Sequence, residues 1–391
     1  MFVERSASAQ LAALARRFQV VLVTGARQVG KTTLLTHDVP GAQYLTLDDP
    51  AVAEQAEGAP AAFLRSLEGT TILDEVQYAP AIFRHLKLAA DRPKSPGTFY
   101  LTGSQRFQLM RGVSESLAGR VGLLHLPTLS YEELVRAGRS LDLLEQVWMG
   151  GFPALYSGTE QAPRFWFPSY VATYLERDVR NLVAVQDLRE YHRFLRALAL
   201  RSANRLNYAD LARDVGIAPN TVRAWVSVLE ASGLVVVVEP WARNRTSRII
   251  RTPKVYFTDT GLLCYLVGIQ SAAQLRSSAM LDAIWETWAF AQLYAWFVNH
   301  GETNPPIHFY RTKDGREVDF VVETESRLVG IECKARERVT SSDARGLEAF
   351  AATLGDKPPL ERVFFAMVPR PHAARGYRVD NGLGLGQLLG G

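Results

Sequence analysis

The sequence predicts an α/β protein: a doubly wound parallel sheet, then a helical middle, then a smaller α/β domain. Over the first 128 residues, short apolar runs alternate with helix-like segments, as they do in doubly wound parallel sheets. The first run leads into a glycine-containing loop and a segment that can be helical. Strand-like runs return after residue 306, and they predict the second α/β domain.

Length and composition fit an ordinary globular protein. A chain of 391 residues is long enough for two to four domains, and 47% apolar with 21% charged residues is an average balance. The net charge of +4 permits a nucleic-acid partner without requiring one. Only Cys264 and Cys333 are present, which excludes a disulfide framework and fits a cytoplasmic location. The apolar segment Leu281–Val298 contains Asp282 and Glu286, so we expect a buried helix and no membrane partner.

The first apolar run, Gln19–Thr24, ends at a loop with the pattern G-x-x-x-x-G-K-[ST]. The glycines allow backbone N–H groups and a helix N-terminus to face a phosphate. In such loops the lysine reaches the β- and γ-phosphates and the hydroxyl after it holds Mg²⁺. An ordinary strand-to-helix turn would not require the full pattern. We therefore predict ATP and Mg²⁺ as cofactors, bound by Gly25, Ala26, Arg27, Gln28, Val29, Gly30, Lys31, Thr32 and Thr33.

Further strands are expected in this domain at Gln43–Leu47, Thr70–Leu73, Thr98–Thr102 and Val121–Leu126. Directly after the third run come Asp74 and Glu75, at the sheet edge where ligands bind. We expect Asp74 to bind Mg²⁺ and Glu75 to polarise the attacking water, although a pair of surface carboxylates is the simpler alternative. After the fourth run, Ser104 is the first candidate for contact with the γ-phosphate or the water.

Thr102 is the second candidate for contact with the γ-phosphate or the attacking water. The segment Ser114–Arg120 resembles the AAA+ superfamily, in which an arginine after this helix reaches the neighbouring subunit's γ-phosphate. By position the match is Arg120, with Arg111 and Arg106 as substitutes, and a solvated arginine is the alternative. The resemblance implies a catalytic residue acting between subunits. It therefore implies a homo-oligomer, of which a hexamer is one form.

The middle of the chain contains a helix-turn-helix pattern. Residues 206–215 and 219–230 predict two short helices around a turn at Gly216. The apolar run Leu234–Val238 follows as a strand, so the whole predicts a winged helix. Behind it lies a basic stretch without an acid. A solvated hairpin or a protein-binding module would also fit, but we expect DNA contacts from Arg223, Arg243, Arg245, Arg248, Arg251 and Lys254.

The last domain begins with the Leu281–Val298 helix, whose apolar stripe carries Glu286. Strands are expected at 307–311, 317–322, 328–334 and 362–368, with a helix at 342–354. Asp319 on one strand and Glu332-x-Lys334 on the next match the pattern of restriction-endonuclease-like folds. That resemblance implies that Glu286, Asp319 and Glu332 hold Mg²⁺ and that Lys334 adds positive charge. A degenerate fold used only for binding is the alternative.

Taken together, these motifs resemble a prokaryotic AAA+ ATPase family of mostly unassigned role, over nearly the full length. The resemblance implies an ATPase core at 1–128, a helical linker or lid at 129–200, a winged helix at 201–272 and a nuclease-like domain at 273–391. No arginine for a helical lid is evident. A phosphate loop, a basic wing and a nuclease-like fold in one chain favour an ATP-hydrolysing, DNA-binding oligomer that acts on duplex or branched DNA in repair, recombination or defence. The alternatives are a signalling or defence ATPase whose C-terminal domain binds a protein partner, and an ATP-gated, Mg²⁺-dependent DNA nuclease.

Overall fold

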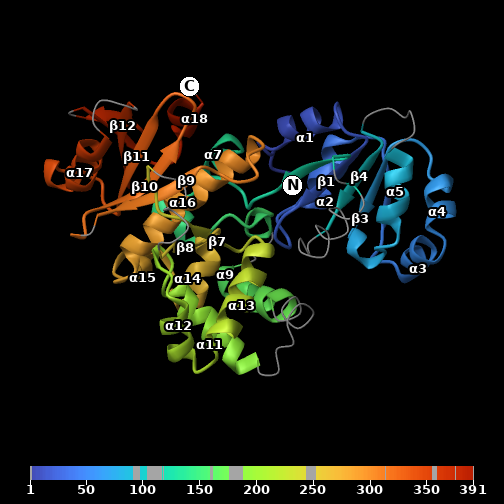
Figure 1. Cartoon of the computed structure of the whole chain (residues 1–391), viewed down its shortest axis with the longest axis horizontal. Coiled ribbons are helices and arrows are strands. Elements are labelled where there is room, and N and C mark those ends of the chain that lie inside the picture. The colour runs from blue at the N-terminus through green and yellow to red at the C-terminus, as the bar shows by residue number, and fades with distance from the viewer. Residues whose placement is uncertain are drawn as a thin grey trace. The chain divides into compact units, whose positions relative to one another are not determined.

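A computed structural model describes residues 2–90, 97–103, 117, 119–158, 162–175, 188–243, 252–312, 314–354, 359–374 and 376–390 (Figure 1). The chain divides into two compact units. The first contains residues 1–129 together with the short segments 231–233 and 297–303, and the second contains the remainder. The first unit thus ends close to the predicted boundary at residue 128. The three later parts that the sequence distinguishes lie in the second unit, apart from the segments 231–233 and 297–303.

The first unit is built on a parallel five-stranded sheet with the order β2-β3-β4-β1-β5. Every residue of the three central strands is buried, as expected for parallel strands that are covered on both faces. The doubly wound parallel sheet predicted from the alternating runs is confirmed. Its strands are β1 (Val20–Thr24), β2 (Gln43–Thr46), β3 (Thr71–Asp74), β4 (Phe99–Thr102) and β5 (Val121–His125).

Helices cover this sheet and close its core. Apolar side chains of α3, α4 and α5 pack with alternate residues of β1, β3 and β4 in one cluster, while α1 packs over β1 and β5. The helical elements are α1 (Ser8–Ala15), α2 (Lys31–Asp38), α3 (Pro50–Gly58), α4 (Pro60–Ser66), η1 (Val76–Tyr78) and α5 (Ile82–Ala90). Because β1 lies beside β4 and β4 beside β3, the carboxyl ends of these strands meet at one edge.

The first half of the second unit is mostly helical, with one small antiparallel sheet of order β6-β8-β7. Gly216 ends α12 in the left-handed conformation (φ 84°), which is the turn expected before α13. The elements are α7 (Tyr131–Arg136), α8 (Leu143–Met149), η2 (Pro153–Tyr156), α9 (Pro163–Tyr170), η3 (Val171–Leu175), α11 (Leu188–Ala199), β6 (Asn204–Arg205), α12 (Tyr208–Val215), α13 (Pro219–Ala231), β7 (Val235–Val238), β8 (Lys254–Phe257), α14 (Thr260–Leu266) and α15 (Ala272–Arg276).

A six-stranded mixed sheet forms the rest of the second unit, in the order β13-β14-β12-β11-β10-β9. Its elements are α16 (Leu281–Asn299), β9 (Ile307–Arg311), β10 (Glu317–Glu323), β11 (Leu328–Lys334), η5 (Ser341–Ala344), α17 (Arg345–Leu354), β12 (Leu360–Ala366), β13 (His372–Ala374), β14 (Tyr377–Asp380) and α18 (Leu385–Leu389). The small α/β domain that the sequence predicts is present, and β13, β14 and α18 extend it. No helix of the described residues has the length and apolar character that crossing a membrane requires.

Two helices sandwich this sheet. On β10, Phe320 contacts Phe290 of α16, whereas the next residue, Val321, belongs to the apolar cluster that contains Leu347 and Phe350 of α17. Because successive side chains of a strand point to opposite faces, α16 and α17 cover opposite faces of the sheet.

The small and large sheets of the second unit are joined through the end of β7. Pro240 forms a parallel bridge with Phe309 of β9, and the Trp241 amide donates to the Phe309 carbonyl at 2.5 Å. The Trp241 ring lies in the apolar core under α17, 5.0 Å from the Phe350 ring centre. The helix-turn-helix part therefore shares a core with the C-terminal sheet.

Candidate active site

The loop between β1 and α2 has the backbone that its glycines predict. Gly25 has φ 145° and Gly30 has φ 93°, and Gln28 is also left-handed at φ 62°. A Cβ at Gly25 would lie 2.3 Å from the Leu126 carbonyl oxygen, so no larger residue fits there. Gly30 caps α2, whose first turn contributes its N–H groups to the edge of the loop.

Lys31 folds back over this loop. Its side chain is buried, and Nζ donates to the carbonyl oxygens of Gly25 at 3.1 Å and Ala26 at 2.9 Å. These are exchangeable acceptors, since a phosphate oxygen with its negative charge is a stronger partner for an ammonium group. The Lys31 ammonium group thus lies at the loop, and its contact with phosphates stays a prediction.

Asp74 is the centre of a hydroxyl network at the end of β3. Thr32 Oγ1 donates to its carboxylate oxygens at 3.1 and 3.0 Å, and the Thr102 hydroxyl donates to Oδ1. Hydroxyl and carboxylate oxygens side by side form a donor set that suits Mg²⁺. The predicted pair Thr32 and Asp74 therefore fits the metal that accompanies ATP.

Tyr44 also donates to Asp74, at 2.8 Å, although its side chain remains 43% exposed. Partial burial, together with the hydrogen bond and charge of Asp74, raises the pKa of Tyr44 to about 12. The sequence analysis missed this residue. The pairing of β2 with β3 brings it to Asp74, and the sequence shows only that Tyr44 is the second residue of an expected strand.

Glu75 follows in the left-handed conformation, with φ 55° and ψ 48°. Its amide donates to the Thr102 hydroxyl at 3.2 Å, and its carboxylate accepts from the Gln77 side-chain amide. Thr102, the second candidate from the sequence, therefore bridges Asp74 and Glu75. Ser104, the first candidate, lies outside the described residues, as do Arg106 and Arg111. Arg120 is exposed in the turn before β5.

In the second unit, the helix pair α12–α13 exposes one face of α13. Val222, Val226 and Leu229 are buried, as their helical spacing predicts, and the opposite face exposes Asn220, Arg223 and Ser227. The Arg223 guanidinium lies 4.3 Å from the centre of the Tyr208 ring on α12, a contact that orients it. Arg243 is exposed, and Arg245, Arg248 and Arg251 lie outside the described residues.

Lys254 does not join this basic surface. It begins β8, its side chain is only 4% exposed, and Nζ forms an ion pair with Glu286 of α16 at 2.9 Å and a second with Glu317 of β10. The expectation of a solvated phosphate contact is therefore wrong for this residue, because β8 directs it into the second unit. The sequence shows its position in a basic run but not the acids that the fold brings to it.

Lys254 enters an acid cluster, which comprises Glu286, Glu317, Asp319 and Glu332. Asp319 accepts from the Cys333 amide at 2.7 Å, and Glu332 pairs with Lys334 at 2.9 Å. Tyr256 donates to Glu286 at 2.6 Å. The structure thus brings the predicted carboxylates and Lys334 into one region, and it adds the unforeseen Glu317, Lys254 and Tyr256.

Burial dominates the electrostatics of the acid cluster. Burial first, and the nearby Asp319 second, raise the pKa of Glu286 to about 8 against the opposing effect of Lys254. Burial likewise raises the pKa of Glu332 to about 8 and that of Asp319 above its ordinary value. For Lys254 burial acts to lower the pKa, but Glu286, Asp319 and Glu317 together raise it.

The implied metal does not fit this cluster. Within the part of the chain that the structure describes, no three His, Cys, Asp or Glu side chains are arranged to hold an ion. The expected Mg²⁺ site at Glu286, Asp319 and Glu332 is not formed. The physical reason is that ammonium groups lie among these carboxylates. Lys254 pairs with Glu286, and Lys334 pairs with one oxygen of Glu332, whose other oxygen is buried without a hydrogen-bond partner among the described residues.

Asp259, which directly precedes α14, has a structural role. It is fully buried at the start of α14 and accepts from the Gly151 amide at 2.7 Å and the Leu262 amide at 2.9 Å. A Cβ at Gly150 would lie 2.5 Å from its Oδ1, so a side chain at that position would collide with Asp259. Asp259 joins two distant loops of the second unit.

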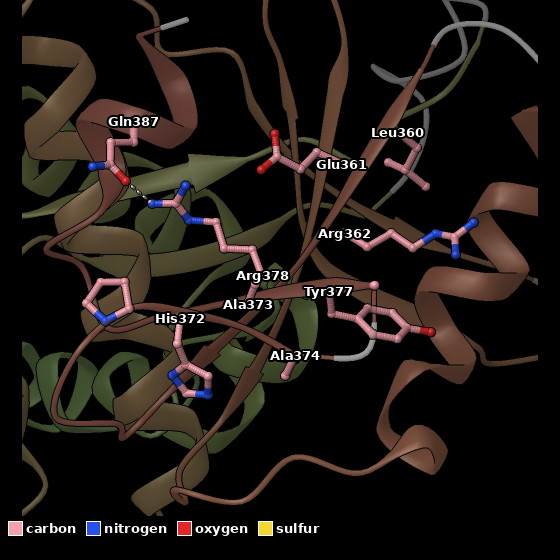
Figure 2. A pocket seen from close by; sticks show the side chains of 11 residues that line it. Leu360, Glu361, Arg362, His372, Ala373, Ala374, Tyr377, Arg378 and Gln387 are labelled. Carbon is pink, nitrogen blue, oxygen red and sulfur yellow. Dashed lines mark hydrogen bonds between the residues drawn. The ribbon is translucent and has the colours of Figure 1, made fainter.

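An open hollow of about 780 Å³ lies at the far edge of the large sheet, between β12, β14 and the segment before β13 (Figure 2). Arg378 lines it, but its guanidinium already pairs with Asp380 at 3.1 Å and donates to the Gly384 carbonyl at 2.8 Å. His372 and Tyr377 lie nearby on the strands (Figure 2). These groups form no arrangement with evident chemistry.

Comparisons with known proteins support an AAA-type domain in the first unit. Residues 17–135 match the AAA domain family, whereas residues 140–273 and 281–368 match two domains of unknown function, DUF8612 and DUF4143. Among solved structures, a Walker-type ATPase of Pyrococcus abyssi aligns at a TM-score of 0.46 and 17% identity, over 68% of this chain and 96% of that one. The Thermotoga maritima RuvB Holliday junction branch migration motor aligns at a TM-score of 0.32 and 16% identity, over 60% of this chain and 90% of that one.

Two curated relatives are much closer in sequence. They are the uncharacterized proteins Rv2008c of Mycobacterium tuberculosis and Mb2031c of Mycobacterium bovis. Each is 33% identical over 339 residues, which is 85% of this chain and 74% of the relative. Identity at that level over most of both chains establishes common descent, and the phosphate loop lies in the part that matches the AAA family. The protein therefore belongs to the family of Rv2008c and Mb2031c, and its first unit is a P-loop domain of the AAA type.

Proposed function

We propose that this protein is an ATP-hydrolysing, DNA-binding homo-oligomer that acts on duplex or branched DNA. The observation that carries the hydrolytic part is the network at the phosphate loop. Lys31 lies over the loop, Thr32 and Thr102 donate to Asp74, and Glu75 follows directly. These are the groups that phosphoryl transfer to water requires, gathered at the carboxyl edge of a parallel sheet.

In this proposal Lys31 releases its two carbonyl acceptors and binds the terminal phosphates. Thr32 and Asp74 would hold Mg²⁺, which when bound neutralises charge on the phosphate oxygens. Glu75 accepts a proton from the attacking water. Thr102 transmits the position of Asp74 to the Glu75 backbone, because its hydroxyl donates to one and accepts from the other. Ser104 remains a candidate for contact with the γ-phosphate.

Arg120 supplies the proposed link between subunits. It is exposed immediately before β5, and AAA-type domains use an arginine at this point to complete the neighbour's site. A guanidinium that enters from another subunit stabilises charge on the transferred phosphoryl group. Hydrolysis would then depend on oligomerisation.

The DNA part of the proposal rests on the second unit. The order α11, β6, α12, α13, β7 and β8, with β8 central in its small sheet, supports a winged helix. Its second helix would present Asn220, Arg223 and Ser227 to a DNA groove. Arg243, and with it Arg245, Arg248 and Arg251, would contact phosphates.

The shared core at Trp241 gives this proposal a mechanical consequence. Since the helix-turn-helix part and the C-terminal sheet are joined by a backbone bridge and common packing, they should move as one body on DNA. A rearrangement driven by ATP would then be carried by the connection to the AAA domain rather than within the second unit.

The test is ATP turnover and DNA binding of the full chain, measured with duplexes, forks and four-way junctions at two salt concentrations. Binding should weaken as salt rises, because phosphate contacts release counterions. Arg223→Ala should weaken binding by roughly five- to 100-fold, the range for one base-edge contact, while ATP turnover without DNA stays unchanged. Arg213→Ala is the matched control, since it removes an exposed arginine of α12 that pairs with Asp210. Absence of binding to every DNA at moderate salt would refute the DNA role and leave the ATPase proposal standing.

A further inference from the structure

We propose that the Lys254 ammonium is the permanent cation of the acid cluster. In this proposal the wild-type chain binds no divalent metal there, and removal of Lys254 opens a divalent-metal site. This goes beyond the DNA-binding ATPase described above and does not depend on it. It concerns what the nuclease-like domain can hold.

The first observation behind this proposal is the position of the Lys254 side chain. Its Nζ lies within contact distance of carboxylate oxygens from two separate elements, Glu286 on α16 and Glu317 on β10. A point shared by carboxylates of different elements is where a metal ion would bind in a site of this kind. The Phe309 ring, with its centre 5.4 Å from Nζ, closes another side. A protein cation thus lies where an ion would be bound.

The surrounding groups hold the Lys254 ammonium group beside Glu286 and Glu317. Lys254 is the first residue of β8, which is hydrogen-bonded on both sides by β6 and β7. Its side chain is only 4% exposed, so it cannot withdraw to solvent without breaking the core. Tyr256, two residues along the same strand, donates to the Glu286 oxygen that accepts from Lys254.

The remaining carboxylates are partly occupied. Asp319 accepts from the Cys333 amide, and one oxygen of Glu332 pairs with Lys334, while its other oxygen is buried without a hydrogen-bond partner among the described residues. A divalent ion entering this cluster would meet two ammonium groups and would have to break these contacts. In this proposal the cluster serves as an internal ion-pair network.

The experiment measures Mn²⁺ binding by electron paramagnetic resonance on the full chain without nucleotide, so that binding with ATP does not contribute. Wild type and Glu286→Gln should bind the same number of Mn²⁺ ions. Lys254→Met should gain one Mn²⁺ per chain, and the double variant Lys254→Met/Glu286→Gln should lose it again. Lys254→Met should also show a Mn²⁺-dependent rise in melting temperature that wild type lacks.

Two results would overturn the proposal. One is a Mn²⁺ ion in wild type that Glu286→Gln removes, because the cluster would then hold metal despite Lys254. The other is a folded Lys254→Met that gains no ion. If Lys254→Met folds only when Mn²⁺ is present, the ion replaces the lysine and the proposal is supported. Failure to fold with and without Mn²⁺ counts against it. DNA binding and ATP turnover are separate readouts, so failure here leaves the proposed function intact.

Discussion

Substitutions of Glu75 should affect the stability of the protein and its ATP turnover for separate reasons. Its left-handed backbone, with φ 55° and ψ 48°, costs a non-glycine residue about 1–2 kcal/mol. Glycine removes that cost but gives the unfolded chain freedom of about 0.4–1 kcal/mol. Glu75→Gly and Glu75→Ala both lose the carboxylate and its contact with Gln77, so their difference isolates the backbone. The glycine variant should be the more stable by roughly 0.5–1 kcal/mol.

The direction of this stability difference tests the strain argument, because at ordinary positions the alanine variant is more stable than the glycine variant. Urea denaturation of both variants measures the free energy of unfolding, and phosphate release measures turnover. Both variants, and Glu75→Gln, should lose turnover by at least about 100-fold, as expected when a general base is removed, and should still bind nucleotide. An alanine variant equal to or more stable than the glycine variant would refute the strain argument. Turnover within a few fold of wild type would refute the catalytic role.

Three further predictions follow from contacts described above. Thr102→Val, which keeps the shape of the side chain but removes the hydroxyl between Asp74 and Glu75, should lower turnover by roughly tenfold or more, measured at saturating ATP. Arg120→Ala should lower turnover without abolishing nucleotide binding, and mixing it with Lys31→Ala should restore activity if the site is shared; mixtures no more active than their parts would exclude sharing. Burial raises the pKa of Asp259 to about 6, above its value in the unfolded chain. The folded state therefore keeps this proton to higher pH, and wild type should lose about 3 kcal/mol of stability relative to Asp259→Asn between about pH 4 and pH 7. A stability difference that does not change with pH in urea denaturation would contradict this.

The first unit could be predicted almost entirely from the sequence. Its strands are continuous apolar runs, because parallel strands are buried on both faces, and its loop is a motif whose spacing is fixed by the phosphate it binds. Tyr44 could not be predicted, since it reaches Asp74 through the pairing of two strands that are separated in sequence by α3 and α4. The sequence does not show that the Thr102 side chain faces Asp74, because a run of residues does not give the directions of its side chains, and Ser104 lies outside the described residues.

The second unit was predictable in its elements but not in its charge pairing. The helices α12 and α13 and strands β9 to β12 follow hydrophobic periodicity and turn residues, which are local signals. Lys254 lies in a basic run, and only the tertiary fold reveals that it faces Glu286 and Glu317. Short edge strands such as β13, with three residues, carry too little pattern to be found.

The joint at Trp241 also bears on how the second unit folds. Its indole lies in the core beneath α17 and donates to Glu323 at 2.9 Å, while its backbone continues the bridge from the small sheet. Neither sheet can therefore open without exposing part of the other's apolar core. The backbone amides of β8 and β10 should exchange with solvent through one shared opening event rather than two. Fragments cut between residues 272 and 273 would each lack half of a cooperative unit, so the helix-turn-helix part and the C-terminal sheet are better studied as a single piece.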